Sequence, residues 1–320
     1  MAVFQAPSLH DIRSAAARIA AHARVTPVLH SSELDARAGA ALHFKCEHLQ
    51  VGGAFKFRGA CNAVWSLGEE EARHGVVTHS SGNHGAALAL AARTRKIPAH
   101  IVVPEGAVAA KLANIERAGG ILHRCAPTQA AREDACATVQ RETGAMLVHP
   151  YADARVIAGQ GTIVPELLQQ VPGLDAVIVP VGGGGLASGC AIALAALSPS
   201  ARLIGAEPAG ADDAFQSLQR GERVTDVVPH TICDGLRATI GEPNFALLSA
   251  HRVEVISVDD DATLAAMRLV WAELKQTIEP SSAVVLAALL AQRERFAGQR
   301  IGLVLSGGNV DLDALPFIRQ

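Results

Sequence analysis

The chain has 320 residues, of which 49% are hydrophobic, and its formal net charge is −3. This length exceeds the usual size of a single core and predicts one large or two intertwined domains. The nearly balanced charge and the lack of a long Lys/Arg block argue against nucleic acid as a partner. The apolar runs fall short of the roughly 20 residues of a membrane span, and the first residues lack a signal-peptide pattern, so we expect neither a membrane partner nor secretion.

The six cysteines are scattered along the chain and form no C-x-x-C pair. Scattered thiols in a soluble chain of this size are typical of buried small side chains in a reducing compartment. We therefore expect a cytoplasmic protein without a disulfide framework or a cysteine-ligated zinc site.

Short β-branched runs alternate with alanine-rich windows along the chain. The expected strands are, in chain order, 41–47, 76–80, 99–103, 121–125, 146–149, 176–181, 202–207, 254–258 and 300–305. Helix formers with apolar residues three or four apart fill windows between them, at 85–95, 130–142, 186–197, 262–274 and 282–296. This alternation predicts an α/β protein with parallel sheets covered on both faces. We expect a small domain at 69–147 and a discontinuous large domain formed by 1–68 and 148–320.

The first candidate site residue is Lys56, in the glycine-rich segment Gly53–Ala60 after an expected strand. Phe55 and Phe57 would partly desolvate its amine, which lowers the pKa of a lysine and favours the nucleophilic free base. An isolated lysine is more often a surface residue whose stem covers apolar side chains. The glycine-rich context and the motifs further along the chain favour the reactive amine.

Four consecutive glycines, Gly182–Gly185, lie between the strand at 176–181 and the helix at 186–197. Such a run costs backbone entropy, and it makes sense where backbone amides approach a phosphate at a helix start. A tight turn needs only one or two glycines. A dinucleotide-binding loop is an alternative, because Glu207 lies near the usual offset of about 20 residues, although the unbroken mid-chain run fits that loop poorly. A lysine amine and a phosphate cup together point to pyridoxal phosphate.

Two further loops follow expected strands. Ser80–Gly85 opens an alanine-rich helix, where free amides bind anions such as a carboxylate, although plain helix capping is the commoner use of Ser and Asn there. His84 alone is more typical of a hydrogen-bonded structural histidine. Ser306 follows the strand at 300–305, and the carboxyl end of a strand faces the ligand crevice in open α/β sheets. By itself the segment of Ser306 is typical of a turn.

Three acidic residues lie in one short stretch after the strand at 202–207: Glu207, Asp212 and Asp213. Their clustered oxygens could hold Mg²⁺ or Ca²⁺. A helix N-terminus, which favours acidic residues, explains Asp212 and Asp213 better.

Taken together, these segments resemble the fold-type II family of pyridoxal-phosphate enzymes, in its threonine/serine dehydratase and serine racemase branch. The resemblance runs from about Val25 to the end of the chain. It implies the tryptophan synthase β-like fold, with two intertwined parallel-sheet lobes, and pyridoxal 5′-phosphate as cofactor.

The resemblance also assigns cofactor contacts. Lys56 matches the lysine that carries the cofactor as a Schiff base, with Phe55 beside it. Asn83 matches the residue that hydrogen-bonds the phenolic oxygen of the cofactor. Gly182, Gly183, Gly184 and Gly185 match the phosphate cup, and Ser306 matches the residue that faces the pyridine nitrogen.

Substrate and metal contacts are implied in the same way. The loop formed by Ser80, Ser81, Gly82, Asn83 and His84 matches the substrate-carboxylate loop, and Ser81 matches the serine that, in racemases, is the acid/base on the face of the substrate opposite the lysine. Arg132 falls where this branch has an Arg-Glu pair near the substrate, with a salt bridge to Glu133 as the alternative. Glu207, the Ala211 carbonyl and Asp213 match a segment that binds Mg²⁺ or Ca²⁺.

The resemblance implies a homodimeric lyase that converts a small L-β-hydroxy amino acid, threonine or serine first, to a 2-oxo acid and ammonia by α,β-elimination. Serine racemase and L-threo-3-hydroxyaspartate dehydratase are the alternatives. Ala54 replaces the serine common two positions before the lysine, and Gly52 replaces a common threonine, which leaves the choice of substrate open. Intact Lys56, Asn83 and Ser306 argue against a non-catalytic binding protein.

Overall fold

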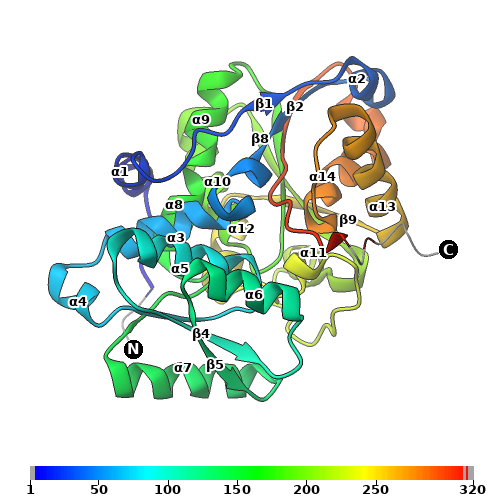
Figure 1. Ribbon diagram of the computed structural model, residues 1–320. Helices are drawn as coiled ribbons and strands as arrows, with labels where there is room; N and C mark the ends of the chain where they lie inside the picture. The colour runs from blue at the N-terminus through cyan, green and yellow to red at the C-terminus, as the bar shows by residue number, and fades with distance from the viewer. Residues whose placement is uncertain (1–3, 313–314, 316–320) are drawn as a thin grey trace.

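The computed structural model describes residues 4–312 and 315, so the outermost residues of the predicted large domain lie outside the described part (Figure 1). Its strands form two sheets. The larger has the order β1-β2-β10-β7-β8-β9 and the smaller the order β5-β4-β3-β6. The strands of the larger sheet are β1 Val28–Leu29, β2 Ala41–Lys45, β7 Ala176–Pro180, β8 Arg202–Pro208, β9 Glu254–Val258 and β10 Arg300–Val304. Those of the smaller sheet are β3 Val76–His79, β4 Ala99–Pro104, β5 Ile121–Cys125 and β6 Met146–Leu147.

The strand pairings are parallel, apart from the antiparallel pair that β1 makes with β2. Parallel strands need crossover connections, and helices supply them. The α-helices are α1 Leu9–Ile19, α2 Ser32–Ala38, α3 Lys56–Trp65, α4 Glu69–Arg73, α5 Asn83–Arg95, α6 Ala109–Ala118, α7 Gln129–Thr143, α8 Ala154–Gly161, α9 Ile163–Gln170, α10 Gly185–Leu197, α11 Asp213–Arg220, α12 Glu242–Ala250, α13 Asp260–Leu269 and α14 Pro280–Ala291. The chain thus has the predicted α/β, fold-type II architecture of two mostly parallel sheets with helices.

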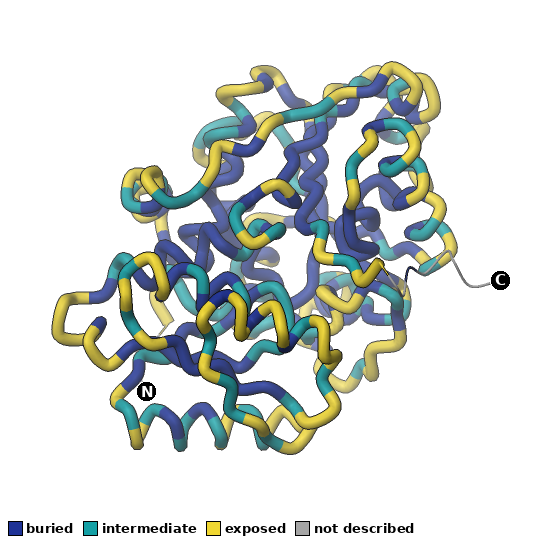
Figure 2. Tube along the Cα trace, in the orientation of Figure 1, coloured by how far each residue is buried: buried dark blue, intermediate teal, exposed yellow. Residues whose placement is uncertain are grey.

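The larger sheet is buried on both faces, as Figure 2 shows by its dark central strands. In β7, Ala176 and Ile178 belong to a core with α13 and α14, while Val177 and Val179 face the opposite core, which includes side chains of α8, α9 and α10. Strand β7 is apolar at every position because each residue meets one core or the other. The same burial explains why the strand could be predicted from an unbroken apolar run.

The smaller sheet is covered by different helices on its two faces. Ile101 and Val103 of β4 pack in a core with α3, α5 and α6, whereas Val102 packs with Cys136 and Val139 of α7. Helix α3 contacts both α5 and α8, so the helix that begins at Lys56 lies where the two lobes meet. The domain limits at 69–147 remain a prediction.

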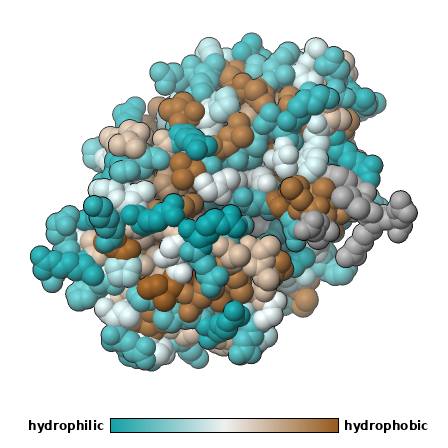
Figure 3. Space-filling view, in the orientation of Figure 1, coloured by the Kyte–Doolittle hydropathy of each residue, from teal (hydrophilic) through white to brown (hydrophobic). Residues whose placement is uncertain are grey.

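The face shown in Figure 3 is mostly hydrophilic, and its apolar residues form separate small groups. Among the described helices, none is both long and apolar enough to cross a membrane. The cysteines are free thiols, and Cys125 is half-buried while the others are buried.

Candidate active site

A cavity of about 1310 Å³ opens between the two sheets. Its walls come from loops that follow the carboxyl ends of β3, β7 and β10, where ligands bind in open α/β sheets. The structure brings together in this cavity Lys56, the Ser80–His84 loop, Arg132, Gly182–Gly185 and Ser306. The acidic segment at 207–213 is not part of the cavity wall.

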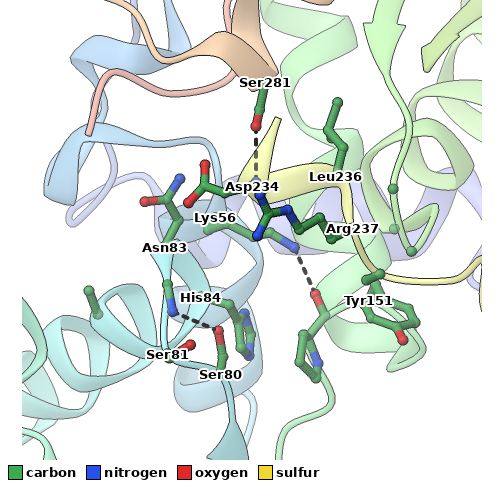
Figure 4. A pocket seen from close by; sticks show the side chains of 18 of the residues that line it. Lys56, Ser80, Ser81, Asn83, His84, Tyr151, Asp234, Leu236, Arg237 and Ser281 are labelled. Carbon is green, nitrogen blue, oxygen red and sulfur yellow. Dashed lines mark hydrogen bonds between the residues drawn. The ribbon is translucent and has the colours of Figure 1, made fainter. Parts of the chain in front are cut away.

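Lys56 is the first residue of α3, and its amine points into the cavity (Figure 4). The Nζ atom donates a hydrogen bond to the carbonyl of Pro150 at 3.1 Å and lies 5.2 Å from the centre of the Phe55 ring. Burial lowers the pKa of Lys56 from 10.5 to about 8, although the nearby carboxylate of Glu279 acts in the opposite direction. A larger fraction of this amine than of an ordinary lysine is therefore the nucleophilic free base near neutral pH.

A buried charge network fixes the start of α3. Arg58 is 1% exposed, and its guanidinium donates from Nε to Glu47 at 2.8 Å and from Nη1 to Glu166 at 2.7 Å. Lys45 of β2 donates to the second oxygen of Glu166 at 2.8 Å. Charges buried in this way are tolerated because each is paired and hydrogen-bonded. The network ties the turn that carries Lys56 to β2 and α9, and sequence reasoning missed it.

Asn83 belongs to a hydrogen-bonded cluster around Glu279. Its Nδ2 atom donates to Oε1 of Glu279 at 3.0 Å, and its Oδ1 atom accepts from Nδ2 of Asn309 at 2.9 Å. Glu279 also accepts from the backbone amide of Asn309 at 3.2 Å. Burial raises the pKa of this carboxyl, and the hydrogen bond from Asn83 opposes that rise. The cluster fixes the amide plane of Asn83 at the N-terminus of α5.

The glycine loop has no room for side chains. A Cβ atom on Gly183 would lie 2.4 Å from the Tyr151 ring, and one on Gly182 would lie 3.0 Å from Cα of Leu236. Gly184 has φ +90° and precedes α10, so the amides at this helix start face the cavity. This is a cradle suited to a phosphate group. Sequence reasoning missed Tyr151, since a lone tyrosine after His149-Pro150 carries no motif.

Three histidines near Lys56 are held in their neutral form. Burial lowers the pKa of His84 well below its ordinary value, and its Nε2 atom donates to the Val148 carbonyl at 3.3 Å. Burial lowers the pKa of His149 to about 4, and its Nδ1 atom accepts from the amide of Ala152 at 3.0 Å. Burial also lowers the pKa of His79, whose ring lies edge-on to His149 at 5.3 Å between ring centres. These rings therefore add no positive charge beside the lysine at neutral pH.

Arg132 of α7 presents a free guanidinium at the cavity wall. Its Nε atom is buried and has no hydrogen-bond partner, and no ion pair with Glu133 is present although both residues are described. The Glu133 carboxylate instead accepts from Gln129 at 2.7 Å. The charges of Arg132 and of Arg223, which lines the same cavity, both act to lower the pKa of Tyr151 against the effect of burial. Two positive side chains thus flank one side of the cavity.

Ser81 lines the cavity in the loop before α5, where Ser80 Oγ accepts from the amide of Gly82 at 3.4 Å. Helix α5 starts at Asn83, so this loop forms the N-terminal end of the helix at the cavity wall (Figure 4). A helix start of this kind suits a carboxylate.

The acidic segment is a separate, buried site. Glu207 accepts from the amides of Ala214 at 3.2 Å and Phe215 at 2.8 Å, and Asp213 accepts from the amide of Ile240 at 2.7 Å. Burial raises the pKa of Asp213 to about 6, and burial together with the charge of Asp213 raises that of Glu207. A cation would relieve the repulsion between these two carboxylates, although no group of three or more His, Cys, Asp or Glu side chains suited to a metal occurs in the described part of the chain. As predicted, α11 begins at Asp213.

The chain is similar in sequence and in structure to known proteins. The pyridoxal-phosphate dependent enzyme family matches residues 19–307. The chain is 47% identical over 311 residues to the beta-hydroxyaspartate dehydratase of Paracoccus denitrificans (strain Pd 1222), covering 97% of this chain and 99% of that protein. It is 48% identical over 315 residues to the serine racemase of Arabidopsis thaliana, covering 97% and 95%. A solved threonine deaminase from T.th. has a TM-score of 0.91 and 40% identity, covering 96% of this chain and 99% of that one.

Proposed function

We propose that this chain, which belongs to the family of pyridoxal-phosphate dependent enzymes, is an ammonia-lyase for a small L-β-hydroxy amino acid. Its products would be a 2-oxo acid and ammonia, with L-threonine or L-serine as the first candidates for the substrate. The observation that carries the proposal is the meeting of a lysine of lowered pKa with a glycine cradle in one cavity. Relatives with dehydratase, deaminase and racemase names support the reaction class.

The residues of the cavity fit the cofactor. Gly182–Gly185 would hold the phosphate at the start of α10, where a Cβ on Gly183 would collide with the Tyr151 ring. Lys56, with Phe55 beside it, would bind the aldehyde carbon, Asn83 would hydrogen-bond the phenolic oxygen, and Ser306 would face the pyridine nitrogen. When bound, pyridoxal phosphate supplies an electron sink next to the α-carbon of the substrate.

Lys56 is the group that we expect to take the α-proton. With a pKa of about 8, roughly a tenth of its amine is unprotonated at pH 7, compared with well under a thousandth for an ordinary lysine. The amides and hydroxyls of Ser80, Ser81 and Gly82 would hold the α-carboxylate at the start of α5. A neutral hydroxyl at Ser306 would leave the ring nitrogen of the cofactor uncharged, which would favour loss of the β-hydroxyl over transamination.

A second candidate substrate, L-threo-3-hydroxyaspartate, is favoured by the unpartnered guanidinium of Arg132. An arginine fork pairs with a carboxylate through two parallel hydrogen bonds, and Arg132 is half-buried with a buried Nε–H that lacks a partner, which is costly. The 47% identical hydroxyaspartate dehydratase supports the same candidate.

Kinetics in wild type, Arg132→Ala and Arg132→Lys separate the two substrate classes. We expect similar relative losses of kcat/KM for threonine, serine and hydroxyaspartate if Arg132 serves the α-carboxylate. If Arg132→Ala lowers kcat/KM for hydroxyaspartate alone, and Arg132→Lys restores it only in part because lysine is a point charge, hydroxyaspartate is the substrate.

Racemisation of the substrate is the alternative outcome of the same proton abstraction. It needs a proton donor on the face opposite Lys56, and Ser81 would supply it. Chiral analysis of D-serine formed from L-serine, measured beside ammonia release, separates a racemase from a lyase.

We further propose that Glu207, the Ala211 carbonyl and Asp213 bind Mg²⁺ or Ca²⁺ in a structural role. We also propose homodimer formation, which follows from the family resemblance, and a cytoplasmic location, which follows from the scattered free cysteines.

A further inference from the structure

The Ser306 hydroxyl faces the cavity, and its effect there depends on where its proton points. The residue is 3% exposed and lies two positions after the end of β10. Its carbonyl accepts a hydrogen bond from the amide of Phe55 at 2.9 Å. A serine hydroxyl can donate one hydrogen bond and accept two. The backbone contact fixes the position of Ser306 but leaves the direction of its O–H bond open.

Ser282 of α14 contacts Ser306 and can fix the direction of the Ser306 O–H bond. This residue is 0% exposed and, unlike Ser306, does not line the cavity. Its Oγ atom accepts a hydrogen bond from the backbone amide of Gly307 at 2.9 Å and lies 3.4 Å from Oγ of Ser306. The amide can only donate, so one lone pair of Ser282 is committed to Gly307.

The proton of Ser282 has one acceptor available. Within the described part of the chain, the only hydrogen-bond partner of this hydroxyl besides the Gly307 amide is Oγ of Ser306, and the distance alone allows either oxygen to donate. A buried donor left without an acceptor costs about 1–3 kcal/mol. Ser282 therefore donates to Ser306, and the Ser306 hydroxyl, which accepts on that side, directs its own proton toward the cavity.

We propose that Ser282 is a positioning residue that makes Ser306 a hydrogen-bond donor to the pyridine nitrogen of the cofactor. The inference rests on the proposed function, in which Ser306 faces that nitrogen. A chain of hydrogen bonds from the Gly307 amide through Ser282 to Ser306 polarises the last hydroxyl as a donor. A donor at this position matches an unprotonated ring nitrogen, which can only accept.

The experiment compares binding of pyridoxal phosphate and of 1-deazapyridoxal phosphate to the apoprotein, by fluorescence titration. The second ligand has C–H in place of the ring nitrogen and cannot accept from Ser306. We expect Ser282→Ala to weaken binding of pyridoxal phosphate by roughly three- to tenfold and to leave binding of the deaza ligand unchanged. Thr263→Val, which removes another fully buried hydroxyl from α13 at a position that does not line the cavity, is the matched control and should change neither affinity.

Equal weakening of both ligands by Ser282→Ala, or no weakening of either, would overturn the role of Ser282. A further Ser282→Ala change in a Ser306→Ala background should have no effect, and an undiminished effect there would also overturn it. If Ser282→Ala does not fold, Ser282→Cys, whose thiol is a weaker donor, should lie between wild type and the expected loss. Failure of the wild-type protein to bind pyridoxal phosphate would instead refute the proposed function.

Discussion

Replacing Gly183 by alanine tests the cofactor cradle through the closest contact in the glycine loop. The new Cβ atom would lie 2.4 Å from Cγ and Cδ1 of Tyr151, whereas carbon atoms pack at about 3.5–4.0 Å. The tyrosine cannot simply withdraw, because its amide donates to Nδ1 of His149 and its carbonyl accepts from Nδ2 of Asn244 at 3.1 Å. The loop must therefore move, and with it the amides that would hold the phosphate.

Overpacking of this kind costs about 1–3 kcal/mol. With an unfolding entropy of about 2.1 cal/mol/K per residue over 320 residues, this cost corresponds to a decrease in Tm of roughly 1.5–4.5 °C. If the displaced loop loses the same free energy in binding, affinity for pyridoxal phosphate should fall by about 5- to 150-fold. Calorimetry of the apoprotein measures Tm, and equilibrium dialysis with pyridoxal phosphate measures its affinity for the cofactor.

Two further variants make the result specific to the ring of Tyr151. Gly68→Ala is the control, because Gly68 has φ −63° and a Cβ there would meet its nearest neighbour at 3.6 Å, and it should bind the cofactor as wild type does. Adding Tyr151→Ala to Gly183→Ala removes the obstacle and should recover part of the lost affinity. Wild-type affinity in Gly183→Ala alone would refute the close-approach argument.

Four other predictions concern the lysine, the loop serine and the acidic segment. Lys56→Ala should abolish the visible absorbance of the bound cofactor and turnover; borohydride fixation of the cofactor to a different lysine would contradict the assignment. In wild type, the rate at which the apoprotein captures pyridoxal phosphate should rise with pH around about 8, because the neutral amine attacks and the ammonium form prevails at lower pH; a rise only near 10.5 would contradict the lowered pKa. Ser81→Ala should reduce racemisation of L-serine far more than ammonia release, and equal losses would favour a binding role. EDTA should lower Tm and Mg²⁺ restore it, whereas a metal response retained in Asp213→Ala would exclude this site.

Most strands could be predicted from the sequence because they are largely apolar runs between helical windows, and the partly exposed edge strand β5 follows the same alternation. The prediction of 121–125 and of 254–258 matched the observed β5 and β9 at both ends. The antiparallel β1, Val28–Leu29, was not predicted, since two residues cannot establish a period. Expected helix 262–274 ends earlier as α13, because its last turn widens into a π-helix at Val270–Leu274.

The site was predictable where a motif marks it and not where function depends on contacts across the fold. Lys56, Asn83 and Gly182–Gly185 carry local patterns, and the cavity brings them together. Tyr151 and Ser282 meet the glycine loop and Ser306 only after folding, and neither pattern nor composition distinguishes them from ordinary packing residues. A hydrogen bond between a residue of α14 and the loop after β10 has no signature in a single sequence.

The central claim is tested most directly by assaying the purified, cofactor-loaded protein with L-threonine, L-serine and L-threo-3-hydroxyaspartate. Ammonia and the corresponding 2-oxo acid should form in equal amounts from at least one of them, and Lys56→Ala should form neither. No ammonia and no 2-oxo acid from any of the three substrates would contradict the lyase assignment.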